Sequence, residues 1–114
     1  TRYGFRDLIA CGGADILQPD ANVLGGITEF RHIASLASAH NLPVAPHGSA
    51  LLHVHLVAAV SNGLIVEHVV TEGGERGLIH GNLTLDEDGM LAPPSAPGLG
   101  VTLDEAYLAE THIG

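Results

Sequence analysis

Length and composition place this chain among ordinary globular domains. Its 114 residues are 46% hydrophobic, with a mean hydropathy of +0.28, which supplies a core for one domain and excludes a disordered tail. Its 13 acidic residues against four arginines give a net charge of −9, so the chain repels phosphate backbones and anionic lipid, and we expect neither nucleic acid nor a membrane as partner.

The absence of lysine and the single cysteine limit the chemistry further. Without lysine the chain cannot supply a Schiff base, a P-loop lysine or a lysine general base, so the eight histidines are the main candidates for proton transfer near neutral pH. Cys11 cannot form an internal disulfide, and no basic segment with a cleavage site opens the chain. We therefore expect a cytoplasmic protein in which Cys11 is a small buried hydrophobic residue.

The first half of the chain alternates helical and extended patterns. Apolar residues at helical spacing predict a helix over residues 2–10, and a short apolar strand over residues 15–18 follows. A second helix is predicted to begin at the glycine pair 25–26 and to end at Asn41, before a strand over residues 43–45. The apolar stripe of this helix consists of Ile27, Phe30, Ile33, Ala34 and Ala37.

Residues 49–61 fit either a helix or a strand. The segment 52–56 alternates strictly, as a strand does, but the alternation breaks after it, and a strand here would leave no crossover between its neighbours. We therefore favour a helix with Ser49 as its N-cap, followed by a strand over residues 64–66. Short apolar strands separated by helices predict an α/β fold, with parallel strands buried on both faces.

The composition changes in the second half of the chain. Residues 71–114 are rich in glycine, proline and acidic residues. Two strand-like pieces, 83–85 and 90–92, flank a turn at 88–89, and a last helix is predicted over residues 103–110. We interpret this segment as a tail that packs on another part of the protein.

Three polar residues each follow a short apolar strand. Asp20, His47 and Glu67 are separated by 27 and 20 residues, each about one strand-and-helix unit. In parallel α/β folds the carboxyl ends of successive strands lie side by side on one face, and active sites are built there. We therefore expect these side chains to converge, with Asp20 selecting the tautomer of His47.

Each of these residues also has a simpler explanation that the sequence leaves open. Asp20 could cap the turn that follows it, and His47 could be a loop histidine with ordinary hydrogen bonds. Glu67 could be a solvated charge at the end of a strand. Their regular spacing is the feature that favours a shared catalytic site.

Other motifs point less clearly to chemistry. His53 and His55 would share one face of a strand and could bind a metal there, but on a helix they point about 200° apart. The glycine pair 25–26 could offer amide groups to an anion, although close packing explains the glycines equally well. We assign no metal ligand within the chain.

Longer stretches of the chain resemble a known family. "ADILQPDANVLGGITEFRHIASLASAHNLPVAPHGS", "HLVAAVSNGLIVEH" and "DGMLAPPSAPGLGVTLDE" are similar to the C-terminal part of the enolase superfamily, in the mandelate racemase and muconate lactonizing enzyme group. The resemblance covers nearly the whole chain. Within the group, "TRYGFRDLI", "QPD", "GGITE" and "PHGS" most resemble the acid-sugar dehydratases, such as rhamnonate dehydratase.

The resemblance implies a fold and a reaction. Residues 1–70 would form the last strand and helix units of a TIM-like (β/α)8 barrel, and residues 71–114 would form a tail that returns to a capping domain. The reaction would be dehydration of a sugar acid, in which a proton is removed next to the carboxylate and the β-hydroxyl leaves as water. Magnesium would stabilise the enediolate, with its ligands located before residue 1.

The resemblance also implies roles for individual residues. His47 in "PHG" and Asp20 in "QPD" match the proton-transferring dyad of the group. Glu67 in "VEH" matches the glutamate that hydrogen-bonds the substrate carboxylate or enolate oxygen. Ser49 and Asn22 lie near the same strand ends and are further candidates for substrate contact.

Several alternatives stay open. A racemase or epimerase of the same superfamily would need a second base that this chain does not show, and a non-catalytic fragment would carry the strand-end residues as relics. Only about three of the eight barrel units are present, so we expect the isolated chain to be inactive and either marginally stable or self-associating. Family members commonly form homo-oligomers, which we expect for the full-length protein with its small-molecule substrate.

Overall fold

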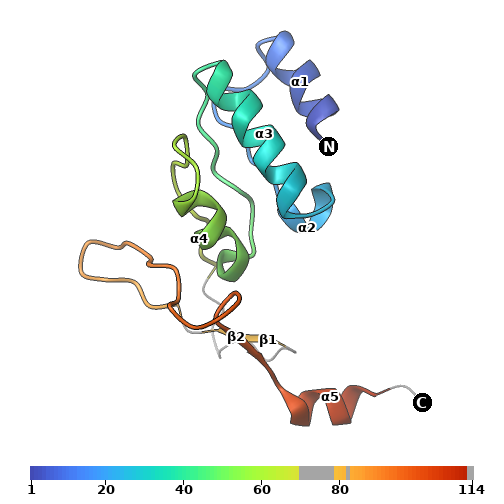
Figure 1. Cartoon of the computed structure of the whole chain (residues 1–114), viewed down its shortest axis with the longest axis vertical. Helices are drawn as coiled ribbons and strands as arrows, with labels where there is room; N and C mark the ends of the chain where they lie inside the picture. Colours follow the sequence, from blue (N-terminus) through green and yellow to red (C-terminus); the bar gives the residue numbers. More distant parts are fainter. Residues whose placement is uncertain (70–78, 82, 113–114) are drawn as a thin grey trace. The chain divides into compact units, whose positions relative to one another are not determined.

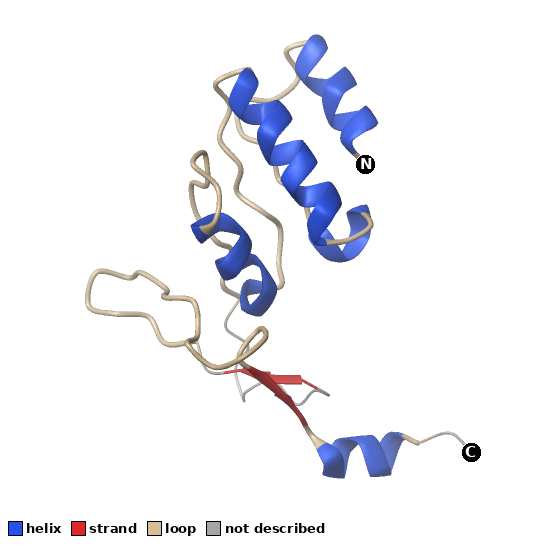
Figure 2. Cartoon of the chain, viewed as in Figure 1, coloured by secondary structure: helices blue, strands red, loops and turns tan. Residues whose placement is uncertain are grey.

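The computed structural model describes residues 1–69, 79–81 and 83–112, and the chain divides into two compact units, Thr1–His68 and Val69–Gly114. The described helices of the first unit are α1 (Arg2–Ala10), α2 (Ala21–Leu24), α3 (Ile27–Ala39) and α4 (Ala50–Ala58) (Figure 1). The described elements of the second unit are β1 (Ile79–Gly81), β2 (Val101–Leu103) and α5 (Glu105–Thr111) (Figure 2). Among the described residues, the structure contains no helix with the length and apolar character needed to span a membrane.

Three extended segments run parallel through the first unit, with Val44 in the middle. Val44 forms parallel bridges to Leu17 on one side and to Gly63 on the other. Its N–H donates to the Asn62 carbonyl at 2.9 Å, and its carbonyl accepts from the Leu64 N–H at 2.9 Å. Because both bridges are parallel, the carboxyl ends of the three segments lie at the same edge.

The bridged regions are shorter than the predicted strands. The sequence predicts strands over residues 15–18, 43–45 and 64–66, whereas each segment contributes one bridging residue, within the predicted strand or next to it. The first two segments contain Pro19, Pro43 and Pro46. Proline lacks the N–H donor that would continue the hydrogen-bond ladder between strands. The order and direction of the segments agree with the prediction.

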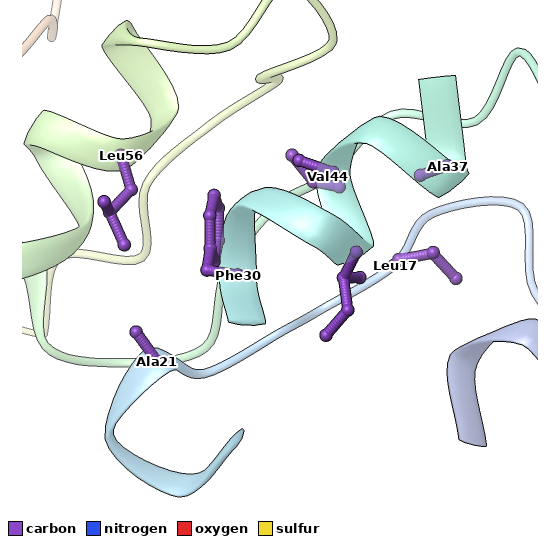
Figure 3. Close-up of a cluster of buried hydrophobic side chains, with 8 residues drawn as sticks. Leu17, Ala21, Phe30, Ala37, Val44 and Leu56 are labelled. Atoms are coloured by element: carbon purple, nitrogen blue, oxygen red, sulfur yellow. The ribbon is translucent and has the colours of Figure 1, made fainter. Parts of the chain in front are cut away.

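Helix α3 supplies half of the buried apolar cluster of the first unit. Four residues of its predicted stripe are buried, whereas Ile27 in the first turn is 46% exposed. The core side chains gather between α3, α4 and the extended segments, as Figure 3 shows. The buried cluster consists of Leu17, Ala21, Phe30, Ile33, Ala34, Ala37, Val44 and Leu56.

Helix α1 packs along α3 and has the predicted bounds. The Glu29 carboxylate accepts hydrogen bonds from the backbone N–H of Arg2 at 2.6 Å and from its guanidinium at 2.7 Å. The backbone hydrogen bond in particular lowers the pKa of Glu29. The prediction of a buried Cys11 is wrong: this residue follows α1 in a surface turn, is exposed, and donates from Sγ to the Leu8 carbonyl.

Residues 50–58 form a helix, so the strand alternative is wrong. Helix α4 ends at Ala58, earlier than predicted, and the chain then turns back so closely that a Cβ at Gly63 would collide with the carbonyl oxygen of Val57. Ser49 occupies the N-cap position but has a left-handed backbone with φ 43° and makes no capping hydrogen bond. The predicted capping role of Ser49 is therefore wrong.

The second unit contains a short antiparallel pair that the sequence pattern did not predict. In it, Ile79 of β1 lies opposite Leu103 of β2. Both strands have three residues and are largely exposed, so they lack the apolar alternation that would have identified them. The pieces predicted as strands, 83–85 and 90–92, are joined by one isolated bridge between Leu85 and Leu91.

Helix α5 begins at Glu105, two residues later than predicted, because residue 103 belongs to β2. Asp104 is its N-cap, and Oδ1 accepts from the Tyr107 N–H at 2.9 Å. Oδ2 lies 2.8 Å from Nε2 of His80 in β1. The Tyr107 hydrogen bond, followed by that of His80, lowers the pKa of Asp104.

Candidate active site

The structure brings Asp20, His47 and Glu67 together at the carboxyl ends of the three parallel segments. His47 lies between the two carboxylates: Nδ1 is 3.6 Å from Asp20 Oδ2, and Nε2 is 4.0 Å from Glu67 Oε2. The His47 side chain is 69% exposed, so a small molecule can reach it. The catalytic roles of these residues stay a prediction at this point.

The position of Asp20 follows from the local fold. The extended segment ends at Pro19, and Asp20 becomes the N-cap of α2. Its Oδ1 accepts from the backbone N–H of Asn22 at 2.9 Å and from the side-chain amide of Asn22 at 3.1 Å. The simpler explanation, that Asp20 caps the next turn, is therefore correct for one oxygen, and the other oxygen faces His47.

The surroundings of Asp20 favour its charged form. Burial alone would raise the pKa of its carboxyl, but a hydrogen bond from the Asn22 backbone, the nearby His47 ring and a hydrogen bond from the Asn22 side-chain amide lower it. The net result is a pKa below the ordinary value. A permanent carboxylate next to Nδ1 suits the task of orienting a histidine that moves protons.

Glu67 is held beside His47 by the loop that carries the histidine. The N–H of Gly48 donates to Glu67 Oε2 at 2.5 Å. Gly48 has φ 61°, a left-handed conformation that favours glycine. The Glu67 side chain is 46% exposed, and Oε1 has no hydrogen-bond partner among the described residues. This second oxygen is the one that a ligand can contact.

Asn22 and Ser49, the two further candidates for substrate contact, also meet. The side-chain amide of Asn22 donates to Ser49 Oγ at 2.6 Å. The same amide group donates to Asp20, so Ser49, Asn22, Asp20 and His47 form one connected set. The amide thereby links the start of α2 to the start of α4 at the edge of the site.

A sixth residue, His53, belongs to this region, although the sequence pattern suggests no role for it other than that of a metal ligand. It lies on α4, is fully buried, and contacts the backbone directly after Asp20 and directly after His47. The sequence contains one indication of this position. His53 comes four residues after Ser49 and three before Leu56, a spacing that places the three residues on one face of a helix. A histidine on the core-facing side of an apolar helix needs polar partners.

Comparison with known proteins identifies the fold family. Residues 1–107 match the family model described as "Enolase C-terminal domain-like". The chain belongs to this enolase C-terminal domain-like family. Its fold also matches solved members of the mandelate racemase superfamily, so the predicted relationship is confirmed.

Curated relatives of this enolase-family chain are acid-sugar dehydratases. L-Rhamnonate dehydratase from Saccharopolyspora erythraea is 42% identical over 110 residues, which cover 91% of this chain and 28% of the relative. D-Galactonate dehydratase from Ralstonia pickettii is 36% identical over 123 residues, which cover 96% of this chain and 32% of the relative. The chain therefore spans about a third of the length of these curated relatives or less.

Solved structures of the same superfamily give a consistent result. L-Talarate dehydratase from Polaromonas sp. JS666, complexed with Mg and L-glucarate, has a TM-score of 0.83 and 40% identity and is matched over 96% of this chain and 29% of that protein. A racemase from Streptomyces coelicolor A3(2) with bound magnesium has a TM-score of 0.80 and 30% identity, over 96% and 29% of the two chains. Both classes of enzyme thus occur among the structural relatives.

Magnesium in these two relatives raises the question of whether this enolase-family chain could hold the ion. Among its described residues, no group of three or more His, Cys, Asp or Glu side chains is placed to bind a metal. Asp20 Oδ1 and Glu67 Oε2 are both engaged by N–H donors. The described residues of this chain therefore do not fit a magnesium site.

Proposed function

We propose that the protein carrying residues 1–114 is a dehydratase of sugar acids and that this chain contributes its proton-transfer residues. The observation that carries the proposal is the placement of His47 between the Asp20 and Glu67 carboxylates on an accessible face. A histidine with one nitrogen beside a carboxylate and the other beside an open site is the arrangement that general acid–base catalysis requires. The dehydratase relatives support the choice of substrate class.

In this proposal His47 performs both proton transfers. A hydrogen on Nδ1, directed to Asp20, leaves the Nε2 lone pair to remove the proton next to the substrate carboxylate. The electrons of the broken C–H bond form the enediolate. When the β C–O bond then breaks, the departing hydroxyl takes the proton from Nε2 and leaves as water. One histidine suffices for both transfers when the proton and the hydroxyl leave from the same face of the substrate, and we propose this syn geometry.

Glu67 would stabilise the enediolate as it forms. In its protonated form, Oε1 would donate a hydrogen bond to the substrate carboxylate or enolate oxygen, while Oε2 keeps its contact with the Gly48 N–H. Asn22 and Ser49 would contact other hydroxyl groups of the sugar acid from the edge of the site. In this proposal His47 moves the proton, whereas Glu67, Asn22 and Ser49 bind and orient the substrate.

The remaining parts of the proposal concern the whole protein. Residues 1–70 would form the last units of an enolase-type barrel, and residues 71–114 a tail on the barrel and a capping domain. Magnesium would be bound by residues outside residues 1–114, and a talarate dehydratase relative is complexed with Mg. We further propose a homo-oligomer located in the cytoplasm.

The test uses the complete gene product that carries residues 1–114. We would measure dehydration of a panel of acid sugars that includes rhamnonate, galactonate and talarate, with magnesium present, for wild type and His47→Ala. His40→Ala is the matched control, because His40 is exposed at the end of α3 and lies outside the site. Loss of turnover in His47→Ala alone supports the proposal. A folded wild type with no turnover on any acid sugar contradicts it.

A racemase or epimerase is the second candidate, favoured by the structural match to the Streptomyces coelicolor racemase. Such an enzyme would use His47 on one face of the substrate and a second base on the other face. Incubation in deuterated water separates the two reactions. A racemase incorporates deuterium next to the carboxylate and forms the epimer without loss of water, whereas the proposed dehydratase forms the keto acid.

A further inference from the structure

We propose that His53 is a positioning residue that holds the loop carrying Asp20 and the loop carrying His47 at a fixed separation. His53 does not touch the open face of the site, since it is fully buried in α4. The inference rests on the proposed function, because positioning matters only if Asp20 and His47 act together. The contacts themselves are a property of the structure and can be measured separately.

Two hydrogen bonds join the His53 ring to the two loops. Nε2 accepts from the backbone N–H of Ala21 at 3.0 Å, and Nδ1 lies 2.6 Å from the backbone carbonyl of Gly48. Ala21 directly follows Asp20, and Gly48 directly follows His47. The imidazole is therefore a rigid spacer between the peptide groups next to the two members of the dyad.

The two backbone partners allow one tautomer of the His53 ring. An amide N–H can only donate and a carbonyl oxygen can only accept, so Nδ1 carries the hydrogen and Nε2 is the acceptor. Asp20 Oδ1 lies 3.6 Å from Nε2, but this oxygen already accepts two hydrogen bonds from Asn22. His53 thus serves as a neutral connector, whereas His47 faces the open site.

Packing fixes the orientation of the connector. The His53 ring stacks on Phe30 of α3 with a centroid distance of 6.2 Å and an interplanar angle of 28°. Both side chains have no exposed surface. A ring held in this way cannot swing to follow a moving loop, so the loops must adapt to the ring.

Gly48 extends the connection to the third residue of the site. Its carbonyl accepts from His53 while its N–H donates to Glu67 Oε2. The ring is therefore linked to the backbone beside Asp20 and His47 and, through one glycine, to the Glu67 carboxylate. Loss of the ring's polar atoms would leave the Ala21 N–H and the Gly48 carbonyl without their partners and would release all three strand ends.

The test compares three substitutions at residue 53 in the complete gene product. His53→Phe keeps an aromatic ring but neither hydrogen bond. His53→Gln can still accept from Ala21, and His53→Asn can still donate to Gly48. Leu56→Ala is the matched control, because it removes buried contacts of the same helix without touching either loop's polar groups. We would measure kcat, KM and thermal unfolding for each protein.

We expect His53→Phe to lower kcat by about 10- to 100-fold with little change in KM, because the dyad is displaced while the substrate contacts remain. His53→Gln and His53→Asn should each recover part of the loss. Leu56→Ala should lower the unfolding temperature and leave kcat of the folded protein near the wild-type value. Equal kcat loss in His53→Phe and Leu56→Ala, or no recovery in either amide variant, overturns the inference. If His53→Phe does not fold, the two amide variants carry the comparison.

A spectroscopic measurement separates this inference from the proposed function. Nitrogen-15 spectra of the wild-type ring should show a hydrogen on Nδ1 of His53, and the Ala21 amide should be protected from hydrogen exchange, with protection lost in His53→Phe. If the wild type turns over no acid sugar but these signals are found, the proposed reaction fails and the connector stands. A hydrogen on Nε2, or an unprotected Ala21 amide, overturns the connector whatever the activity.

Discussion

The Nδ1 atom of His47 lies 3.6 Å from Oδ2 of Asp20, although the two residues belong to different strand-and-helix units of the chain. The other oxygen of Asp20 is engaged by the Asn22 N–H. The carboxylate is thus turned so that one oxygen caps α2 and the other meets the histidine. One carboxylate thus serves both the fold and the proposed chemistry.

Replacing Asp20 by Asn should reduce turnover by the complete gene product. The amide removes the negative charge beside His47 and no longer selects the tautomer whose Nε2 is free to take a proton, so we expect kcat to fall by about 100-fold or more. Steady-state kinetics on the best substrate of the panel would measure it. Asp15→Asn is the control, since Asp15 is exposed and precedes the bridged segment. Unchanged kcat in Asp20→Asn would remove this carboxylate from the mechanism.

Acid should destabilise the protein partly through Asp20. Its pKa is lowered in the folded state, so its contribution to stability is present above its unfolded pKa of about 3.9 and is lost as the pH falls through the folded value. Wild type should therefore lose stability more steeply than Asp20→Asn below about pH 5. Unfolding midpoints in urea across this range would show the difference. Parallel pH dependence of the two proteins would contradict the prediction.

Asn62 should contribute to stability without any part in the reaction. Its side-chain amide donates to the Ala34 carbonyl at 3.0 Å and to the Leu42 carbonyl at 2.9 Å, which ties α3 to the segment before the central bridge. Asn62→Ala leaves both part-buried carbonyls without this donor, and we expect a loss of about 1–3 kcal/mol in the free energy of unfolding. Urea unfolding would measure it, with the exposed neighbour in Ser61→Ala as the control, expected within about 0.5 kcal/mol of wild type.

Residues 1–114 expressed alone should be inactive and prone to self-association. Central Val44 is bridged on both sides, but the segments of Leu17 and Gly63 each have one neighbour among the described residues, which leaves backbone groups available for pairing. Many large apolar side chains are also exposed, including Ile16, Leu64 and Ile65. Unfolding midpoints that rise with protein concentration would agree with this prediction. A sharp, concentration-independent transition, or metal-dependent dehydration by the isolated chain, would contradict it.

Periodic patterns in the sequence were sufficient for α1 and α3, whereas the short α2 was not predicted and α4 ends earlier than predicted. The bounds of α1 and the buried face of α3 follow from residues a few positions apart, and such local periodicity depends little on the rest of the fold. The spacing of Asp20, His47 and Glu67 likewise follows from repeated strand-and-helix units. Parallel connection then places their side chains at one edge, as the structure shows.

The same sequence patterns could not predict contacts between backbone groups that are far apart along the chain. The spacing of His53 is compatible with a core residue, a metal ligand or a connector, and only the directions of the Ala21 N–H and the Gly48 carbonyl decide among them. The short pair β1–β2 and the exposure of Cys11 were missed for a related reason. The sequence by itself determined which residues stand at the ends of the segments. Tertiary structure decided which atoms of those residues meet, because hydrogen bonds depend on direction in space and not on spacing along the chain.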